Sequence, residues 1–133
     1  VGLVQGLMVH NSGTIDAPIA EHSQKNGRMV IARRGKPSVT DYQVLATSKQ
    51  YSWVQFRIHT GRTHQIRIHL QHIGHSLVCD PLYGSGDPLL LSNIKKNYKL
   101  GKNVLEERPL LGRLALHSWR LTFTLNQEKY MLE

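Results

Sequence analysis

The front half of the chain alternates apolar and polar residues in short runs, a pattern that predicts β-strands. The clearest run extends from Trp53 to His59, where Val54, Phe56 and Ile58 share one face. We expect this face to contact the core, and the opposite face to be polar and basic. Further predicted strands are Val1 to Met8, the extended piece Ile15 to Ile19, and Ser38 to Ala46.

Turn-forming residues separate these strands. The segment Asn11 to Gly13 predicts a turn. Pro18 restricts its own segment to a sheet edge or to a place outside a ladder, because proline has no backbone N–H to donate. A polar loop from Glu21 to Gly27 leads into the short run 28–31, and the basic stretch 33–37 then interrupts the chain.

After the strand that ends at His59, the period of the pattern changes to that of a helix. Ile66, Leu70 and Ile73 share one helical face, so we predict a helix of about three turns over 63–73. Thr63 is placed to cap its start, and Gly74 is placed to end it.

The last third of the chain predicts weaker elements. A helical piece spans Leu90 to Lys96, a lysine-rich loop follows, and a strand pair comprises Leu114 to Leu125 and Lys129 to Leu132. Strands mixed with one or two helices predict an α+β fold. The 133 residues, of which 40% are hydrophobic, are enough for one domain and too few for two.

The charge balance favours a polyanionic partner. Seventeen Lys and Arg residues against nine Asp and Glu residues give a formal net charge of +8, and nucleic acid is the first candidate, ahead of an anionic membrane surface. The single cysteine, Cys79, has no partner for an intramolecular disulfide, so a reducing compartment, the cytoplasm, is expected. No apolar run is long enough to span a membrane.

The densest polar chemistry lies between residues 57 and 72. Arg67 falls at the edge of the apolar helical face, and a half-buried Arg at such a place requires a carboxylate or phosphate. An ordinary surface helix with exposed arginines is the alternative from spacing alone. The residues that make up this concentration are Arg57, His59, Arg62, His64, Gln65, Arg67, His69 and His72.

The sequence disfavours both a metal site and a cysteine nucleophile. His69, His72 and His75 have a permissive spacing, but His69 and His75, six residues apart, point to different helical faces, so we expect no metal site. Cys79 lies among apolar residues rather than beside a base. A second basic cluster, apart from residues 57–72, lies in and beside a Gly/Pro turn, where its side chains can reach phosphates. A generically basic surface is the alternative. Its members are Arg28, Arg33, Arg34 and Lys36.

Several motifs carry a resemblance to a known family. The segment 60–70 reads TGRTHQIRIHL, 72–77 reads HIGHSL, 80–84 reads DPLYG, and 114–118 reads LALHS. Together with GKPSVT at 35–40 and GTIDAPI at 13–19, these motifs resemble the RluA-type ribosomal RNA pseudouridine synthases in one collinear order over nearly the whole chain. The resemblance implies a mixed, mainly antiparallel α+β pseudouridine synthase fold, here in part.

The resemblance implies a cofactor-free isomerisation of uridine in RNA, for which the target base leaves its stack. In this family an Asp within a His-Arg-Leu-Asp stretch is essential, and a pocket Tyr and the Arg of the Gln-Ile-Arg segment support it. Arg67 matches that Arg, and Leu116 matches an apolar contact to the base. Arg62, His64 and Gln65 are the other expected substrate contacts, and Arg57 joins the second basic cluster as an expected RNA contact.

The chain departs from the family pattern in one respect. It contains no His-Arg-Leu-Asp sequence, and the family's pocket Tyr precedes a segment like the one that begins at Val1. We therefore expect residues 1–133 to be one partial catalytic domain whose N-terminal half is absent, which leaves Arg67 with no carboxylate to orient.

The resemblance implies an RNA pseudouridine synthase acting on large-subunit ribosomal RNA, with tRNA also open, and the missing motif predicts a fragment that is inactive alone. A catalytically dead RNA-binding remnant is the competing interpretation. A third is a fragment that folds only with the missing half of its own domain.

Overall fold

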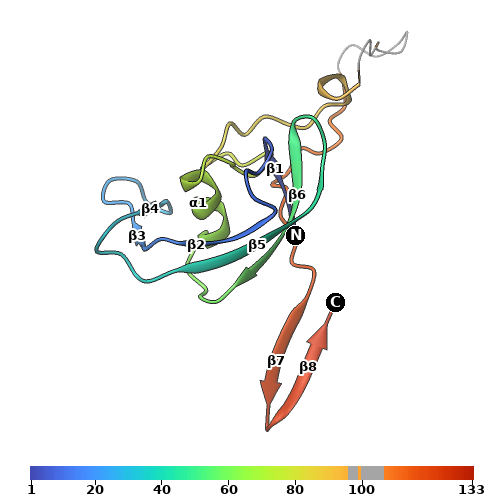
Figure 1. The fold of residues 1–133 in the computed structure, drawn as a ribbon. Helices are drawn as coiled ribbons and strands as arrows, with labels where there is room; N and C mark the ends of the chain where they lie inside the picture. Colours follow the sequence, from blue (N-terminus) through green and yellow to red (C-terminus); the bar gives the residue numbers. More distant parts are fainter. Residues whose placement is uncertain (96–98, 100–106) are drawn as a thin grey trace.

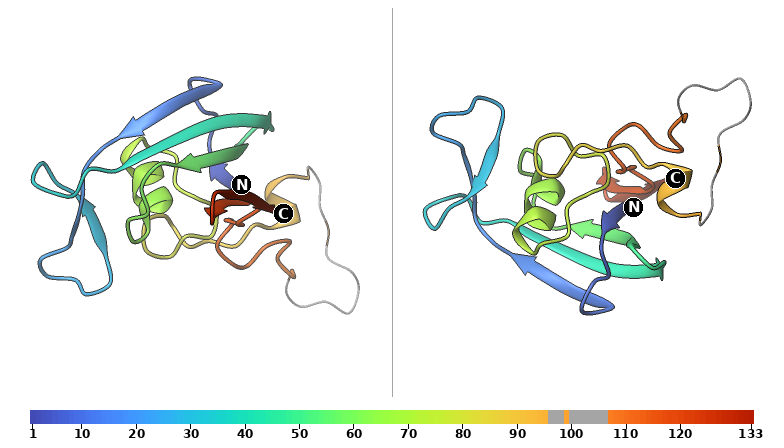
Figure 2. Two further views of the ribbon diagram at one scale, coloured as in Figure 1. Left: turned by 90° about the horizontal axis from the view of Figure 1, so that it is seen from below. Right: turned by 90° about the horizontal axis from the view of Figure 1, so that it is seen from above.

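The computed structural model describes residues 1–95, 99 and 107–133. Its centre is a four-stranded antiparallel sheet in the order β1-β6-β5-β2, and the helix α1 lies against one face of it (Figure 1; Figure 2). These elements are β1 (Gly2–Gln5), β2 (Ser12–Asp16), β5 (Val39–Thr47), β6 (Tyr51–Ile58) and α1 (Gln65–His72).

Two separate hairpins and one short helical turn complete the described part. β3 (Ile19–Glu21) pairs with β4 (Met29–Ile31), and β7 (Leu121–Leu125) pairs with β8 (Glu128–Leu132). All of these pairings are antiparallel, which confirms the predicted α+β class with mainly antiparallel strands. No helix among the described residues is long and apolar enough to cross a membrane.

The core forms where α1 meets the sheet. Val4 on β1, Val54 on β6 and Leu70 on α1 are fully buried and cluster with Leu77, as the alternation on β6 and the helical spacing predict. Ile58, the last residue of β6, is 49% exposed, so its predicted place in the core is wrong. The buried cluster centres on Val54 in the middle of the strand, and the end of the strand lies outside it.

The second core cluster fixes the β3–β4 hairpin to the helix. Ile19 on β3 and Ile68 on α1 pack with Tyr83, and all three side chains are almost completely buried. The helix therefore contacts the large sheet through Leu70 and the small hairpin through Ile68.

The helix begins later than its apolar spacing predicts. Its N-cap residue is His64, with φ 54° and ψ 25°, and no side chain caps it, so Thr63 is neither the cap nor part of the helix. Ile73 ends the helix, and Gly74 follows with φ 83°, as predicted from the tolerance of glycine for this conformation. The helix has eight residues, about two turns.

Other predicted boundaries shift. The strand Val1 to Met8 shortens to Gly2–Gln5, and the turn predicted at Asn11 to Gly13 lies partly within β2. The strand Leu114 to Leu125 begins only at Leu121. The predicted helical piece Leu90 to Lys96 is only a 3-10 turn, Leu91–Asn93. Lys96 lies outside the described residues, as does most of the lysine-rich loop.

The β7–β8 hairpin extends away from the rest of the molecule (Figure 1). Leu121 pairs with Leu132 and Phe123 pairs with Tyr130, whose rings stack at 5.2 Å, so these side chains share one apolar face. Every residue of both strands is exposed. An exposed apolar face of this kind is typical of an interaction surface.

The isolated chain is therefore expected to self-associate through this face. Phe123→Lys places a charge in the apolar face, and we expect it to weaken self-association at least tenfold, because burial of one aromatic side chain contributes about 2 kcal/mol. Sedimentation velocity over a concentration series measures this. Thr122→Lys, on the opposite face of the same strand, is the control, and a wild-type chain that stays monomeric at all concentrations contradicts the prediction.

Candidate functional site

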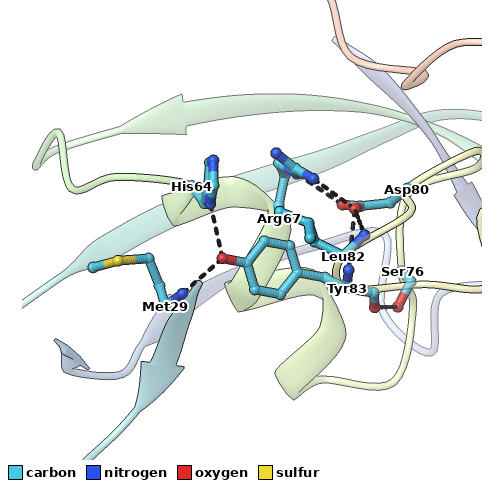
Figure 3. Close-up of polar contacts among 7 residues, drawn as sticks. All are labelled: Met29, His64, Arg67, Ser76, Asp80, Leu82 and Tyr83. Carbon is cyan, nitrogen blue, oxygen red and sulfur yellow. Dashed lines mark hydrogen bonds and ion pairs between the residues drawn. The ribbon is translucent and has the colours of Figure 1, made fainter. Parts of the chain in front are cut away.

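Arg67 forms a two-point ion pair with Asp80 (Figure 3). Its Nε donates to Oδ2 at 2.9 Å and its Nη2 donates to Oδ1 at 2.7 Å. The Arg67 side chain is 13% exposed and that of Asp80 is fully buried. Arg67 thus has the half-buried position and the carboxylate that its spacing indicates. Arg67 is therefore not left without a carboxylate, because Asp80 occupies two of its nitrogens. Its expected support of the family's essential Asp, which lies outside this chain, remains a prediction.

The turn that follows Asp80 holds this carboxylate in place. Its Oδ1 also accepts hydrogen bonds from the backbone N–H groups of Leu82 at 3.0 Å and Tyr83 at 3.1 Å. Burial raises the pKa of Asp80, but the hydrogen bonds from Arg67 and the two N–H groups outweigh it, and the pKa lies below its ordinary value. The same ion pair raises the pKa of Arg67.

Tyr83 joins three segments that are distant in the sequence (Figure 3). Its hydroxyl accepts a hydrogen bond from the N–H of Met29 on β4 at 2.8 Å and lies 2.8 Å from Nδ1 of His64. The guanidinium groups of Arg67 and Arg28 lie 5.0 Å and 5.6 Å from the centre of its ring. Three predicted site residues, His64, Arg67 and Arg28, therefore converge on one buried ring.

Gln65, by contrast, is occupied within the chain. Its Oε1 accepts from the Thr60 hydroxyl at 2.7 Å and from the Arg62 N–H at 3.1 Å. Its Nε2 donates to the Val39 carbonyl and to the Thr40 hydroxyl, both at 2.9 Å. Since the side chain is buried and these four bonds use its capacity, Gln65 positions the loop before α1. Its expected contact with a substrate remains a prediction.

Arg62 and Leu116 lie at the margins of this arrangement. The Arg62 Nε and Nη2 both donate to the Pro37 carbonyl, at 3.1 Å and 3.0 Å, which anchors the side chain to the basic turn before β5. Leu116 is partly buried against the Val54 and Leu70 cluster and forms an isolated bridge with Gly2. Its expected contact with a base remains a prediction.

The basic residues divide between two locations. Arg33, Arg34 and Lys36 are exposed in the turn between β4 and β5, close in sequence to Arg28. Arg57 is exposed on β6 opposite Asp41, and it alternates with Val54 and Phe56, which face α1, so it lies on the other side of the sheet. The structure therefore separates Arg57 from the Arg67 site.

Sequence reasoning missed Asp80 and Tyr83 as parts of this site. Both lie in the DPLYG motif that carries the resemblance, but no periodicity links residue 67 to residues 80 and 83. Among the described residues there is no cluster of side chains suited to hold a metal ion.

Comparisons with known proteins give matches over most of the chain. Residues 1–72 match the family model described as RNA pseudouridylate synthase. An uncharacterized RNA pseudouridine synthase of Chlorobaculum parvum is 42% identical over 127 residues, which cover 91% of this chain and 37% of the relative. Ribosomal large subunit pseudouridine synthase D of Buchnera aphidicola is 41% identical over 118 residues, which cover 87% of this chain and 37% of that protein.

A solved structure extends the likeness to the whole fold. Human RNA Pseudouridylate Synthase Domain Containing 1 matches with a TM-score of 0.72 at 29% identity, covering 98% of this chain and 51% of that chain. This chain thus spans little more than a third of the two curated relatives, 37% of each, and about half of the solved structure.

Asp80→Asn is expected to destabilise the chain by about 3 kcal/mol, because it leaves the buried guanidinium of Arg67 without its counter-charge. Urea unfolding at pH 7 measures this, with Asp87→Asn, an exposed carboxylate, as the control. The pKa of Asp80 is lowered in the folded chain, so its ionised side chain adds to the free energy of unfolding above the ordinary Asp pKa. This contribution is lost as the pH falls from the ordinary Asp pKa through the lowered pKa of the folded chain. Equal stability of the variant and the wild type at pH 7 contradicts the ion pair's role.

Proposed function

The chain belongs to the RNA pseudouridylate synthase family, and on that premise we propose that it is the C-terminal part of a catalytic domain that converts uridine in RNA to pseudouridine. The carrying observation is the convergence of Arg67, His64 and Arg28 on Tyr83, next to the Arg67–Asp80 pair. Ribosomal RNA is the substrate we favour, because the Buchnera relative carries a large-subunit name. Transfer RNA is the alternative substrate.

Arg67 is the residue through which this chain serves catalysis. Asp80 engages Nε and Nη2 of its guanidinium, and among the described residues Nη1 has no hydrogen-bond partner. We assign Nη1 to the essential carboxylate that the resemblance implies, which the rest of the domain supplies. A guanidinium held at two nitrogens presents its third in a fixed direction, which keeps that carboxylate ionised and oriented.

Asp80 itself is not that essential carboxylate. It is fully buried, and both of its oxygens accept hydrogen bonds from Arg67 while Oδ1 also receives the two backbone N–H groups of the turn. Because the side chain is fully buried, neither of its oxygens is accessible to a ribose. In the reaction the N1–C1′ bond breaks, a C5–C1′ bond forms, the C5 proton leaves and N1 gains a proton, so a carboxylate that acts on the nucleotide needs an exposed oxygen.

The remaining proposed contacts with RNA are assigned to side chains near the site and on the surface. Arg33, Arg34 and Lys36 bind RNA phosphates on the side of the basic turn, Arg62 binds beside them, and Leu116 contacts the base. Arg57 is proposed as a separate RNA contact on the other side of the sheet. We also propose that the rest of the catalytic domain covers the apolar face of the β7–β8 hairpin. No cofactor is part of the proposal.

The cytoplasm is the proposed compartment, because Cys79 is a free and buried thiol. The competing function is an RNA-binding remnant without catalysis. The basic turn favours RNA binding under both interpretations, so only turnover separates them.

Release of tritium from RNA labelled at C5 of uridine tests the proposal. The 133-residue chain is expected to give no release, whereas a polypeptide extended to include the family's His-Arg-Leu-Asp stretch is expected to turn over. In the extended polypeptide, Arg67→Lys is expected to lower kcat/KM about 100-fold, because Lys cannot make the two-point pair. Arg113→Lys, at an exposed position, is the control. Turnover by the short chain, with its fold verified by circular dichroism, refutes the assignment.

RNA binding by the short chain is expected to weaken with salt. Replacing Arg33, Arg34 and Lys36 by Ala is expected to reduce the slope of log K against log salt by about 2, since each contact to a single-stranded phosphate contributes about 0.7. Fluorescence anisotropy with a short labelled RNA measures the slope. The charge-matched control replaces three other exposed residues by Ala, namely Lys49, Arg113 and Lys129. Equal slopes for both triple variants would leave the basic turn with no special role.

A further inference from the structure

The buried hydroxyl of Tyr83 has two hydrogen-bond partners, and the direction of these bonds determines which nitrogen of His64 carries the proton. The Tyr83 side chain is only 2% exposed, and its oxygen has two partners, the backbone N–H of Met29 and Nδ1 of His64, each at 2.8 Å. The His64 ring meets the Tyr83 ring edge-on, at 5.5 Å between centres and 71° between planes. Figure 3 shows these contacts together with the Arg67–Asp80 pair.

The available hydrogens assign the direction of each bond. The N–H of Met29 can only donate, so the phenol oxygen accepts there. A phenol has one proton, and its remaining partner is Nδ1 of His64, so the phenol donates to that nitrogen. If Nδ1 carried a proton instead, the buried phenol proton would have no partner among the described residues, at a cost of about 1–3 kcal/mol.

The surroundings keep the His64 ring neutral. Burial lowers the pKa of His64, the positive charge of Arg67 lowers it further, and the carboxylate of Asp80 opposes this in part. A neutral imidazole whose Nδ1 accepts a hydrogen bond must carry its proton on Nε2.

The backbone of His64 directs its ring toward Tyr83. This residue adopts the left-handed conformation immediately before α1, and its side chain makes no hydrogen bond to the free N–H groups of the helix start. A left-handed non-glycine residue is held by its surroundings, and such residues concentrate at functional sites. In Figure 3 the second ring nitrogen of His64 points away from Tyr83, toward the same side as the Arg67 guanidinium.

We infer that Tyr83 is a positioning residue that holds His64 in its neutral Nε2–H form, so that His64 presents a hydrogen-bond donor to an acceptor oxygen of the target nucleotide. Among the described residues Nε2 has no protein partner, and the His64 side chain is partly exposed. This inference rests on the proposed function for the identity of the substrate. The tautomer itself depends only on the geometry of the chain.

Nitrogen-15 NMR of the chain labelled at histidine tests the tautomer. At pH 7.5 we expect a protonated-type shift for Nε2 and an unprotonated-type shift for Nδ1 of His64, whose signal among the eight histidines is assigned by its loss in His64→Gln. Tyr83→Phe removes the donor, and the two tautomers are expected to mix. Tyr42→Phe is the matched control. Protonation on Nδ1 in the wild type, or an unchanged spectrum in folded Tyr83→Phe, overturns the inference.

Kinetics of the extended polypeptide tests the donor. His64→Leu removes the donor and is expected to lower kcat/KM about tenfold, the value of one neutral hydrogen bond. His64→Gln supplies an acceptor and a donor in similar positions, and it is expected to recover most of the loss. Equal activity of the Leu and Gln variants overturns the donor role, whereas absence of turnover in the unsubstituted extended polypeptide refutes the proposed function and leaves the NMR result standing.

The source of the acceptor oxygen is distinguished by ligand titration. Uridine 5′-monophosphate and uridine are added separately to the labelled extended polypeptide, and the Nε2 shift of His64 is followed. A response to the nucleotide alone assigns the acceptor to phosphate, and a response to both assigns it to the uracil or ribose. No response to either ligand at concentrations that saturate the polypeptide overturns the donor role.

Discussion

The ion pair between Arg67 and Asp80 is the constraint on which the arrangement of the site depends. It joins the helix α1 to the turn at Asp80, thirteen residues after Arg67 in the sequence, and both side chains are largely shielded from water. Removing two charges from water is costly, so the pair is stable only because further donors complete it. The two N–H groups of residues 82 and 83 do so, and they also set the direction in which Tyr83 leaves the turn.

Through Tyr83 the same constraint reaches the small hairpin and the start of the helix. Its ring fills the space between Ile19 and Ile68, while its hydroxyl binds Met29 and His64. Apolar packing and directional polar contacts are thus combined in one side chain. A shift of the turn would move the Arg67 partner, the β3–β4 hairpin and the His64 ring together, which makes the site a cooperative unit instead of a set of independent contacts.

The sequence predicts the parts of this unit that depend on local pattern. The strand around Val54, the helix that carries Leu70, its end at Gly74 and the half-buried place of Arg67 all follow from spacing, and the structure confirms them. The start of the helix was not predictable, because Thr63 fits the usual cap and nothing in the periodicity indicates a left-handed His64. Nor does any local rule pair Arg67 with Asp80, because the pairing results from the path of the chain after the helix.

The contrast between the site and the β7–β8 hairpin shows how the chain divides its interactions. Around Arg67, no buried side-chain nitrogen or oxygen of the described residues lacks a hydrogen-bond partner, so the buried polar groups of this part are satisfied within the chain. The hairpin exposes leucine and aromatic side chains on one face, with Leu121 and Leu132 each more than half exposed. An amphipathic two-stranded hairpin has little stability of its own and gains it by packing against another surface. The chain therefore holds a preformed support for Arg67, while the stability of its hairpin depends on a further partner surface.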